Sequence, residues 1–121
     1  MFITYQKFIE SMQPTPADVK KFCVPTGSAE EFALELYERI VRVDDSSYTT
    51  TIVLPPVAEA KGLTYFISVS SGSHDCTVVA HGGATYPDAR NFSSLVLTAD
   101  EDHVAVMSNG VEWVLLVDVT T

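Results

Sequence analysis

The Asn109-Gly110 pair, which lies between two apolar segments, constrains the fold more than any other feature of the sequence. Asn-Gly favours a two-residue type I′ turn, because both central residues of that turn need positive φ. We therefore expect His103–Ser108 and Val111–Val119 to pair as a β-hairpin. Alternate residues from 111 to 119 are apolar and share one face of a strand, with Trp113 as the largest side chain. This alternation predicts that one face of a sheet packs into a core.

Four side chains are expected at the centre of that core. Trp113 and Leu115 lie on the apolar side of the last predicted strand. Tyr65 and Ile67 fall on one side of a strand predicted at Thr64–Ser70, with serines on the other side.

Short apolar segments separated by turn signals fill the second half of the chain. Many short strands with frequent turns indicate a sandwich or a small barrel. We therefore expect a mainly β fold, either an antiparallel β-sandwich or a small barrel, with a small α-helical N-terminal region. The strands are predicted at Tyr48–Leu54, Thr64–Ser70, Asp75–Ala80, Leu95–Ala99, His103–Ser108 and Val111–Val119.

The helical prediction rests mainly on residues 28–41. The segment from Ser28 to Glu31 fits a capping box, in which Ser28 caps the helix and Glu31 reaches back to its amide. Phe32, Leu36 and Ile40 then form one apolar stripe at helical spacing. The pattern predicts a helix from residue 29 to about residue 41.

The segments before that helix are less regular. Thr15 and Pro16 suit the start of a shorter helix that ends near Phe22–Val24. Met1–Met12 fits either an amphipathic helix or a β-prone arm that adds to a neighbouring sheet. We expect residues 1–45 to form an N-terminal arm and helices that cover or dock, and residues 46–121 to form an antiparallel β module.

Three segments carry a resemblance when they are taken in order. They read TIVLPPVAEAKGLTYFISV (Thr51–Val69), DCTVVAHGG (Asp75–Gly83) and LVLTADEDHVAVMSNGVEWVLL (Leu95–Leu116). The set resembles a small β module of bacteriophage virion proteins, found in fibres and in capsid-decorating proteins. The module ends with S-[DN]-G-x-x-W, which the SNGVEW sequence fits. The chain departs from the family at Thr85–Ala89, where members often carry a TIDG-like turn.

The resemblance implies a structural protein that decorates and stabilises a phage capsid by binding the lattice of the major capsid protein. It also implies a homotrimer on the capsid surface, made in the host cytoplasm. The alternative is a small tail- or fibre-associated protein with a carbohydrate- or receptor-binding β module. In that case Tyr86 and Phe92 would stack on sugars.

Apolar residues on both faces of the last predicted strand give a separate reason to expect assembly. Trp113 and Leu115 lie on one face, and Val114 and Leu116 on the other. Neighbouring subunits can cover the second pair, and they can also cover edge strands, which small β modules must protect.

Charge is distributed unevenly along the chain. The formal net charge is −9; residues 1–43 hold five Lys/Arg and six Asp/Glu, whereas residues 44–121 hold two and ten. An acidic surface repels phosphate backbones, so we expect no nucleic-acid partner. The near-neutral N-terminal part is the expected capsid-docking surface, through Phe2, Tyr5, Lys7 and Phe8.

No residue pattern points to catalysis or to a bound cofactor. Cys23 and Cys76 lack zinc-site spacing and are expected to be free, buried thiols, although a disulfide between them is also compatible with the sequence. His74-Asp75-Cys76 groups three reactive residue types, but a Cys–His pair also needs an orienting group and an oxyanion site. Asp100–Asp102 could supply calcium ligands, yet a solvated turn is the favoured interpretation. We expect no enzyme activity, metal or cofactor.

Membrane partners are not expected either. No segment approaches the roughly 20 apolar residues that cross a bilayer. The initial MFITYQKFIESMQ contains charges and has no long apolar region, so a secretion signal is not expected.

Overall fold

The computed structural model describes residues 21–82 and 95–119, and those residues form nine strands in two sheets. The strands are β1 (Lys21–Cys23), β2 (Glu30–Ala33), β3 (Ile40–Val43), β4 (Thr50–Val53), β5 (Thr64–Val69), β6 (Cys76–Val79), β7 (Leu95–Leu97), β8 (His103–Ser108) and β9 (Trp113–Val119).

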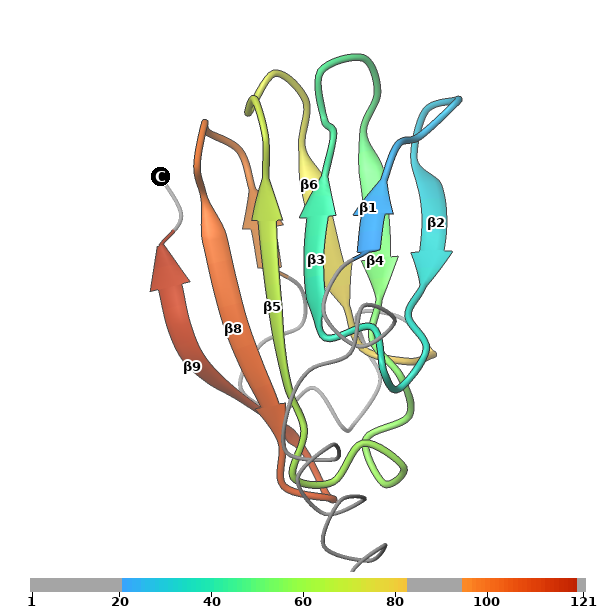
Figure 1. The fold of residues 1–121 in the computed structure, drawn as a ribbon, viewed down its shortest axis with the longest axis vertical. Helices are drawn as coiled ribbons and strands as arrows, with labels where there is room; N and C mark the ends of the chain where they lie inside the picture. Colours follow the sequence, from blue (N-terminus) through green and yellow to red (C-terminus); the bar gives the residue numbers. More distant parts are fainter. Residues whose placement is uncertain (1–20, 83–94, 120–121) are drawn as a thin grey trace, which may run out of the picture.

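From β1 to β6 the chain alternates between the two sheets. The five-stranded sheet has the order β1-β3-β5-β8-β9, and the four-stranded sheet has the order β2-β4-β6-β7. Figure 1 shows β1, β3 and β5 running one way and β2, β4 and β6 running back, so each pair of consecutive strands makes one coil. Lys21 pairs with Val41, and Val41 with Ile67, in parallel. The N-terminal two thirds of the described chain is therefore a short stack of coils.

The last strands close this stack in antiparallel fashion. β7 pairs with β6, β8 pairs with β5, and β9 pairs with β8. The prediction of a mainly β fold is confirmed, but both sheets are mixed rather than antiparallel, and neither closes into a barrel. Strands β4 to β9 lie where the sequence predicts strands, within a few residues at each end.

Both sheets contribute side chains to one core. Trp113 and Tyr65 are its largest fully buried members, and their rings meet edge to face with centroids 5.6 Å apart. The Tyr65 hydroxyl donates a hydrogen bond to the Leu36 carbonyl at 2.8 Å, which ties the connection between β2 and β3 to the core. Edge-to-face aromatic packing adds stability beyond simple burial.

The helix predicted at residues 29–41 is wrong, since strands β2 and β3 occupy that segment, and the described residues contain no helix. Ala29 has φ of 57°, outside the helical region, and the Glu30 carboxylate accepts hydrogen bonds from the Thr26 amide and hydroxyl, each at 2.9 Å. Val41 and Val43 are buried at strand spacing. Pairing with β4 and β5 therefore prevails over the local helical signal.

Other N-terminal predictions have mixed outcomes. The end of the shorter predicted helix is strand β1. Met1–Met12 and the candidate sugar-stacking residues Tyr86 and Phe92 lie outside the described residues. The boundary predicted after Asp45 lies between β3 and β4, and strands on both sides of it share both sheets.

The hairpin between β8 and β9 forms, but its turn differs from the predicted type. Ser108 pairs with Trp113, so four residues rather than two connect the strands. Asn109 has no positive φ; its side-chain oxygen instead accepts hydrogen bonds from the amides of Val111 and Glu112 at 2.9 and 2.8 Å. The Asn side chain thus builds the loop by an Asx-type contact.

Candidate interaction surface

The predicted site residues fall into two groups. The docking residues Phe2, Tyr5, Lys7 and Phe8 lie outside the described residues. Of the four expected core residues, three are buried and one is half-buried against the core cluster: Trp113, Tyr65 and Ile67 are the buried ones and Leu115 the half-buried one.

The His74-Asp75-Cys76 cluster is not arranged for nucleophilic chemistry. Cys76 faces the core and is fully buried, and burial raises the pKa of its thiol to about 12. His74 Nδ1 lies 3.1 Å from the Asp45 carbonyl oxygen, and Asp75 is exposed on the other side of the strand. A protonated, buried thiol is neither nucleophilic nor accessible to a substrate.

The prediction of free, buried cysteines is confirmed. Cys23 and Cys76 are both free and fully buried, one on each sheet. Burial raises the pKa of the Cys23 thiol to about 11. Both side chains therefore act as small apolar residues of the core.

The acidic run at Asp100–Asp102 forms the turn between β7 and β8. The Asp102 carboxylate is buried and accepts hydrogen bonds from the Thr98 and Ala99 amides, both at 3.0 Å. Glu101, with φ of 65°, instead pairs with Arg42 at 3.2 Å. Within residues 21–82 and 95–119, no group of three or more His, Cys, Asp or Glu side chains is arranged to hold a metal ion.

Asp45 is a structural centre that sequence reasoning missed. It is fully buried, and its carboxylate accepts hydrogen bonds from the Ser71 amide, the Ser71 hydroxyl and the Gly72 amide at 2.8–2.9 Å. Gly72, with φ of 70°, packs directly against the backbone of Ala99 and Asp100. A carboxylate followed 26 residues later by Ser-Gly is too general a signal to predict this contact.

We call the side of the five-stranded sheet that points away from the core the outer face; one row across it is apolar, and the rows beside that row also hold Arg42, Thr64, Ser68 and His103. It comprises the strand positions that point away from the core. The β-ladder places Ile40, Phe66, Ala105 and Val117 side by side across four strands. Phe66 is 52% exposed and Ile40 and Val117 are each 41% exposed. A solvated sheet face usually carries polar residues at such positions, so this row is unusual.

A bulge in β9 sets which residues reach the outer face. The pairing shifts between Ala105 and Val106, which leaves Leu116 without a direct partner. Trp113 and Leu115 consequently point inward, while Val117 and Val119 join the outer face. The predicted alternation from 111 to 119 is thus broken midway by one extra residue.

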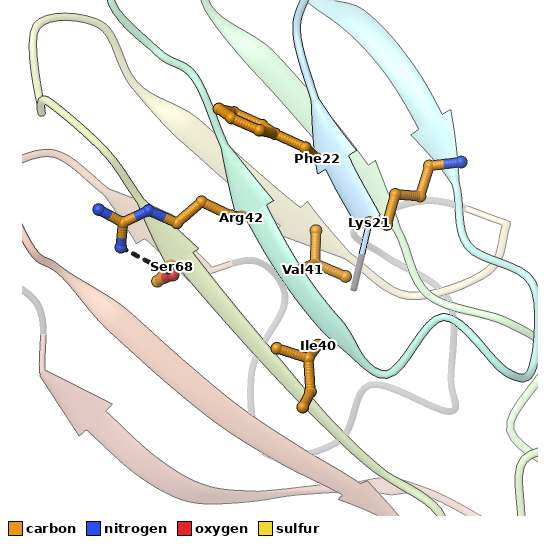
Figure 2. Close-up of a pocket in the computed structure, with 6 residues that line it drawn as sticks. All are labelled: Lys21, Phe22, Ile40, Val41, Arg42 and Ser68. Carbon is orange, nitrogen blue, oxygen red and sulfur yellow. Dashed lines mark hydrogen bonds between the residues drawn. The ribbon is translucent and has the colours of Figure 1, made fainter. Parts of the chain in front are cut away.

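A hollow of about 310 Å³ lies at the β1–β3 side of the outer face. Figure 2 shows Phe22 and Ile40 from these two strands beside the hollow, with Arg42 reaching towards Ser68. The Arg42 Nη1 donates to the Ser68 hydroxyl at 3.2 Å, and Lys21 at the rim pairs with Glu38 at 2.9 Å. The lining is apolar at its centre and basic at its margin.

The outer face of the four-stranded sheet is different. One outward row is Glu31, Thr51, Thr77 and Val96, and the next is Ala33, Val53 and Val79, so this face mixes polar residues with small apolar ones. The five-stranded sheet exposes the larger apolar side chains, among them Phe22, Ile40 and Phe66, so its outer face is the candidate interaction surface.

Comparison with known proteins adds no family assignment. A scan against protein-family models finds no match, and a search of curated proteins also finds none. Within the described residues, no helix has the length and hydrophobicity needed to cross a bilayer.

Proposed function

We propose that this protein is a non-catalytic virion structural protein that decorates a bacteriophage capsid and stabilises its shell. It would bind the lattice of the major capsid protein on the capsid surface, as a homotrimer, after synthesis in the host cytoplasm. The N-terminal residues Phe2, Tyr5, Lys7 and Phe8 would make the contact with the shell.

The observation that carries this proposal is the exposed apolar outer face on a small, tightly organised β domain. Contiguous exposed apolar patches mark interaction sites in soluble proteins. Four of the reactive groups of the described chain are used internally: both thiols are buried, and the Asp45 and Asp102 carboxylates hold turns. The ordered resemblance to phage β modules gives the kind of assembly.

Labelling of purified virions with an antibody against this protein tests the proposal. Signal over the shell supports decoration. Signal at the tail supports instead the tail- or fibre-associated alternative, and absence of the protein from virions overturns both.

Docking through the N-terminal residues is tested separately with shells that lack the protein. The full chain should bind such shells, and a variant without residues 1–13 should stay folded and assembled but fail to bind. A truncated protein that still decorates shells contradicts the docking assignment and leaves decoration itself standing.

A further inference from the structure

The stack of coils is open at its first coil. Among the described residues, β1 pairs only with β3 and β2 pairs only with β4, so each of these two strands has one edge without a partner strand. Figure 1 shows β1 and β2 together at the same end of the stack. Unpaired strand edges readily accept a further strand, so this end of the stack is a place where another segment can add to both sheets.

The hydrogen bonds of β2 show which backbone groups face the open edge. The Leu34 amide donates to the Val53 carbonyl of β4 at 2.9 Å. Backbone groups of successive strand residues point to opposite sides of the strand, so the amides of Glu31 and Ala33 point away from β4. An added strand would therefore accept hydrogen bonds from these two amides.

The spacing of the coils matches the segment that precedes β1. Lys21 pairs with Val41 and Glu30 pairs with Thr50, a step of 20 residues in both sheets. One further step back places residues 1–3 beside β1 and residues 10–13 beside β2. Residues 24–29 and 34–39 join the strands of the first described coil, six residues each, and residues 4–9 and 14–20 would supply six and seven.

The apolar residues of this segment suit the inward positions of a coil. In the 20-residue register Ile3 follows the buried Cys23, and Met12 follows Phe32, which packs against the core. Phe2 would lie beside Phe22 on the outer face, where Phe22 is 63% exposed. An added coil would therefore extend both the core and the apolar part of the outer face.

The remaining residues fall where a coil accepts them. Pro14 and Pro16 lie in a connection and not in either added strand, where a missing amide would remove a ladder hydrogen bond. Glu10 would lie beside Glu30, whose carboxylate is turned to the Thr26 amide and hydroxyl, each at 2.9 Å. The two carboxylates therefore do not have to meet at this margin.

We infer that residues 1–13 form one further coil of the stack, with residues 1–3 added to β1 and residues 10–13 added to β2 in parallel register. The chain's own segment is favoured over a second copy, because a short tether holds it beside the edge at an effective concentration on the order of millimolar. Only the placement of the docking residues rests on the proposed function: Tyr5, Lys7 and Phe8 would fall in the connection between the two added strands.

Paired cysteines test the register. Residue 11 would lie about 4.8 Å from Glu31, within the range for a disulfide. Ser11→Cys/Glu31→Cys should therefore form an internal disulfide under mild oxidation, seen as one linked peptide pair by mass spectrometry while the protein stays monomer-sized on a denaturing gel. Ser11→Cys/Thr77→Cys is the matched control, because Thr77 lies two strands beyond β2, about 14 Å from residue 11, and should form no bond.

Hydrogen exchange in the full chain tests whether the coil covers the open edge. The Glu31 and Ala33 amides should exchange slowly in the wild type. Met12→Asp places a charge at an inward position and should speed their exchange by at least roughly tenfold. Gln13→Asp is the matched control, because it places the same charge at the neighbouring outward position and should leave both amides slow. Circular dichroism confirms that both variants are folded.

Four results overturn the inference: fast exchange of the two amides in the wild type, equal exchange in the two aspartate variants, no bond between positions 11 and 31, or a bond that joins two copies. The oxidised Ser11→Cys/Glu31→Cys variant also separates the coil from the proposed function. If it carries the internal bond but does not bind shells that lack the protein, the coil stands and the docking assignment fails. A wild-type chain that binds shells while both amides exchange fast gives the reverse outcome.

Discussion

Replacement of Trp113 by alanine should remove a large share of the stability of the fold. The indole is fully buried in the core cluster and packs edge to face on Tyr65 with ring planes at 77°. Burial of about 200 Å² at about 25 cal/mol/Å² is roughly 5 kcal/mol, of which alanine keeps about 1, and the ring pair adds about 0.5–1.5 kcal/mol. Because unfolded chains are partly compact, we expect a loss of about 3–5 kcal/mol.

Urea titration followed by far-UV circular dichroism measures this loss. Trp113 is the only tryptophan of the chain, so fluorescence cannot report on the variant. The melting temperature should fall by roughly 12–20 °C at about 4 °C per kcal/mol. Val111→Ala, at a residue 73% exposed in the neighbouring loop, is the control and should cost less than about 0.5 kcal/mol. A loss below about 1 kcal/mol for Trp113→Ala would refute the reasoning, because it would mean that the indole contributes little to the core.

Further predictions concern turns and thiols. Gly72→Ala should prevent folding or lower the free energy of unfolding by more than about 3 kcal/mol in urea titration, because a Cβ there would overlap the backbone of the β7–β8 turn. Gly62→Ala is the control: Gly62 also has positive φ but has open space around it, so this variant should cost only about 1 kcal/mol. Asp45→Asn should cost about 2–3 kcal/mol by the same assay, since an amide nitrogen would face a backbone donor; a change below about 0.5 kcal/mol contradicts this. Burial raises the pKa of Cys23 to about 11 and the pKa of Cys76 to about 12, above the ordinary 9.0. The stability that the two protonated thiols contribute is therefore complete below pH 9, and it is lost as the pH rises from 9 through these raised pKa values. The urea midpoint should therefore fall between pH 9 and pH 11 more steeply in the wild type than in the variant with alanine at both cysteines, and equal slopes would contradict the assignment.

The strands of the second half of the chain were predictable because their signals are local. Tyr65 and Ile67 alternate within six residues, and β5 forms where that alternation lies. The hairpin was predictable for the same reason, but its loop was not. Asn109 can supply either a positive φ or a side-chain hydrogen-bond acceptor, and in the structure it supplies the acceptor. Contacts outside the loop select this conformation; for example, the neighbouring Ser108 hydroxyl donates to the Val57 carbonyl at 2.5 Å.

The helix prediction failed because two periodicities coexist in one segment. Phe32, Leu36 and Ile40 lie at helical spacing, yet Leu36 and Ile40 are 37% and 41% exposed. The residues that pack are Leu34 and Val41, with Val43 two positions on. Isolated helices of a dozen residues are marginal in water, so pairing with existing strands prevails.

The coil repeat could not be predicted because it is a repeat of geometry and not of sequence. In the four-stranded sheet Glu30 pairs with Thr50, and Thr50 with Cys76, so the chain returns after 20 and then 26 residues, as it also does in the five-stranded sheet. Of the six extra residues of the second coil, four lie in the connection between β4 and β5 and two lengthen β5. Ser108 holds that connection through hydrogen bonds with Val57 and Gly62. A fixed-period search fails when one coil is longer than the other. The parallel ladder tolerates this difference, because the extra residues precede Phe66, where the pairing of β5 with β3 begins. The first coil ends in the edge strands β1 and β2, and β9 is an edge strand at the far side of the five-stranded sheet. Edge strands β1 and β9 therefore flank the outer face, while β2 and β7 are the edges of the other sheet, so each sheet has two edges whose backbone groups need protection.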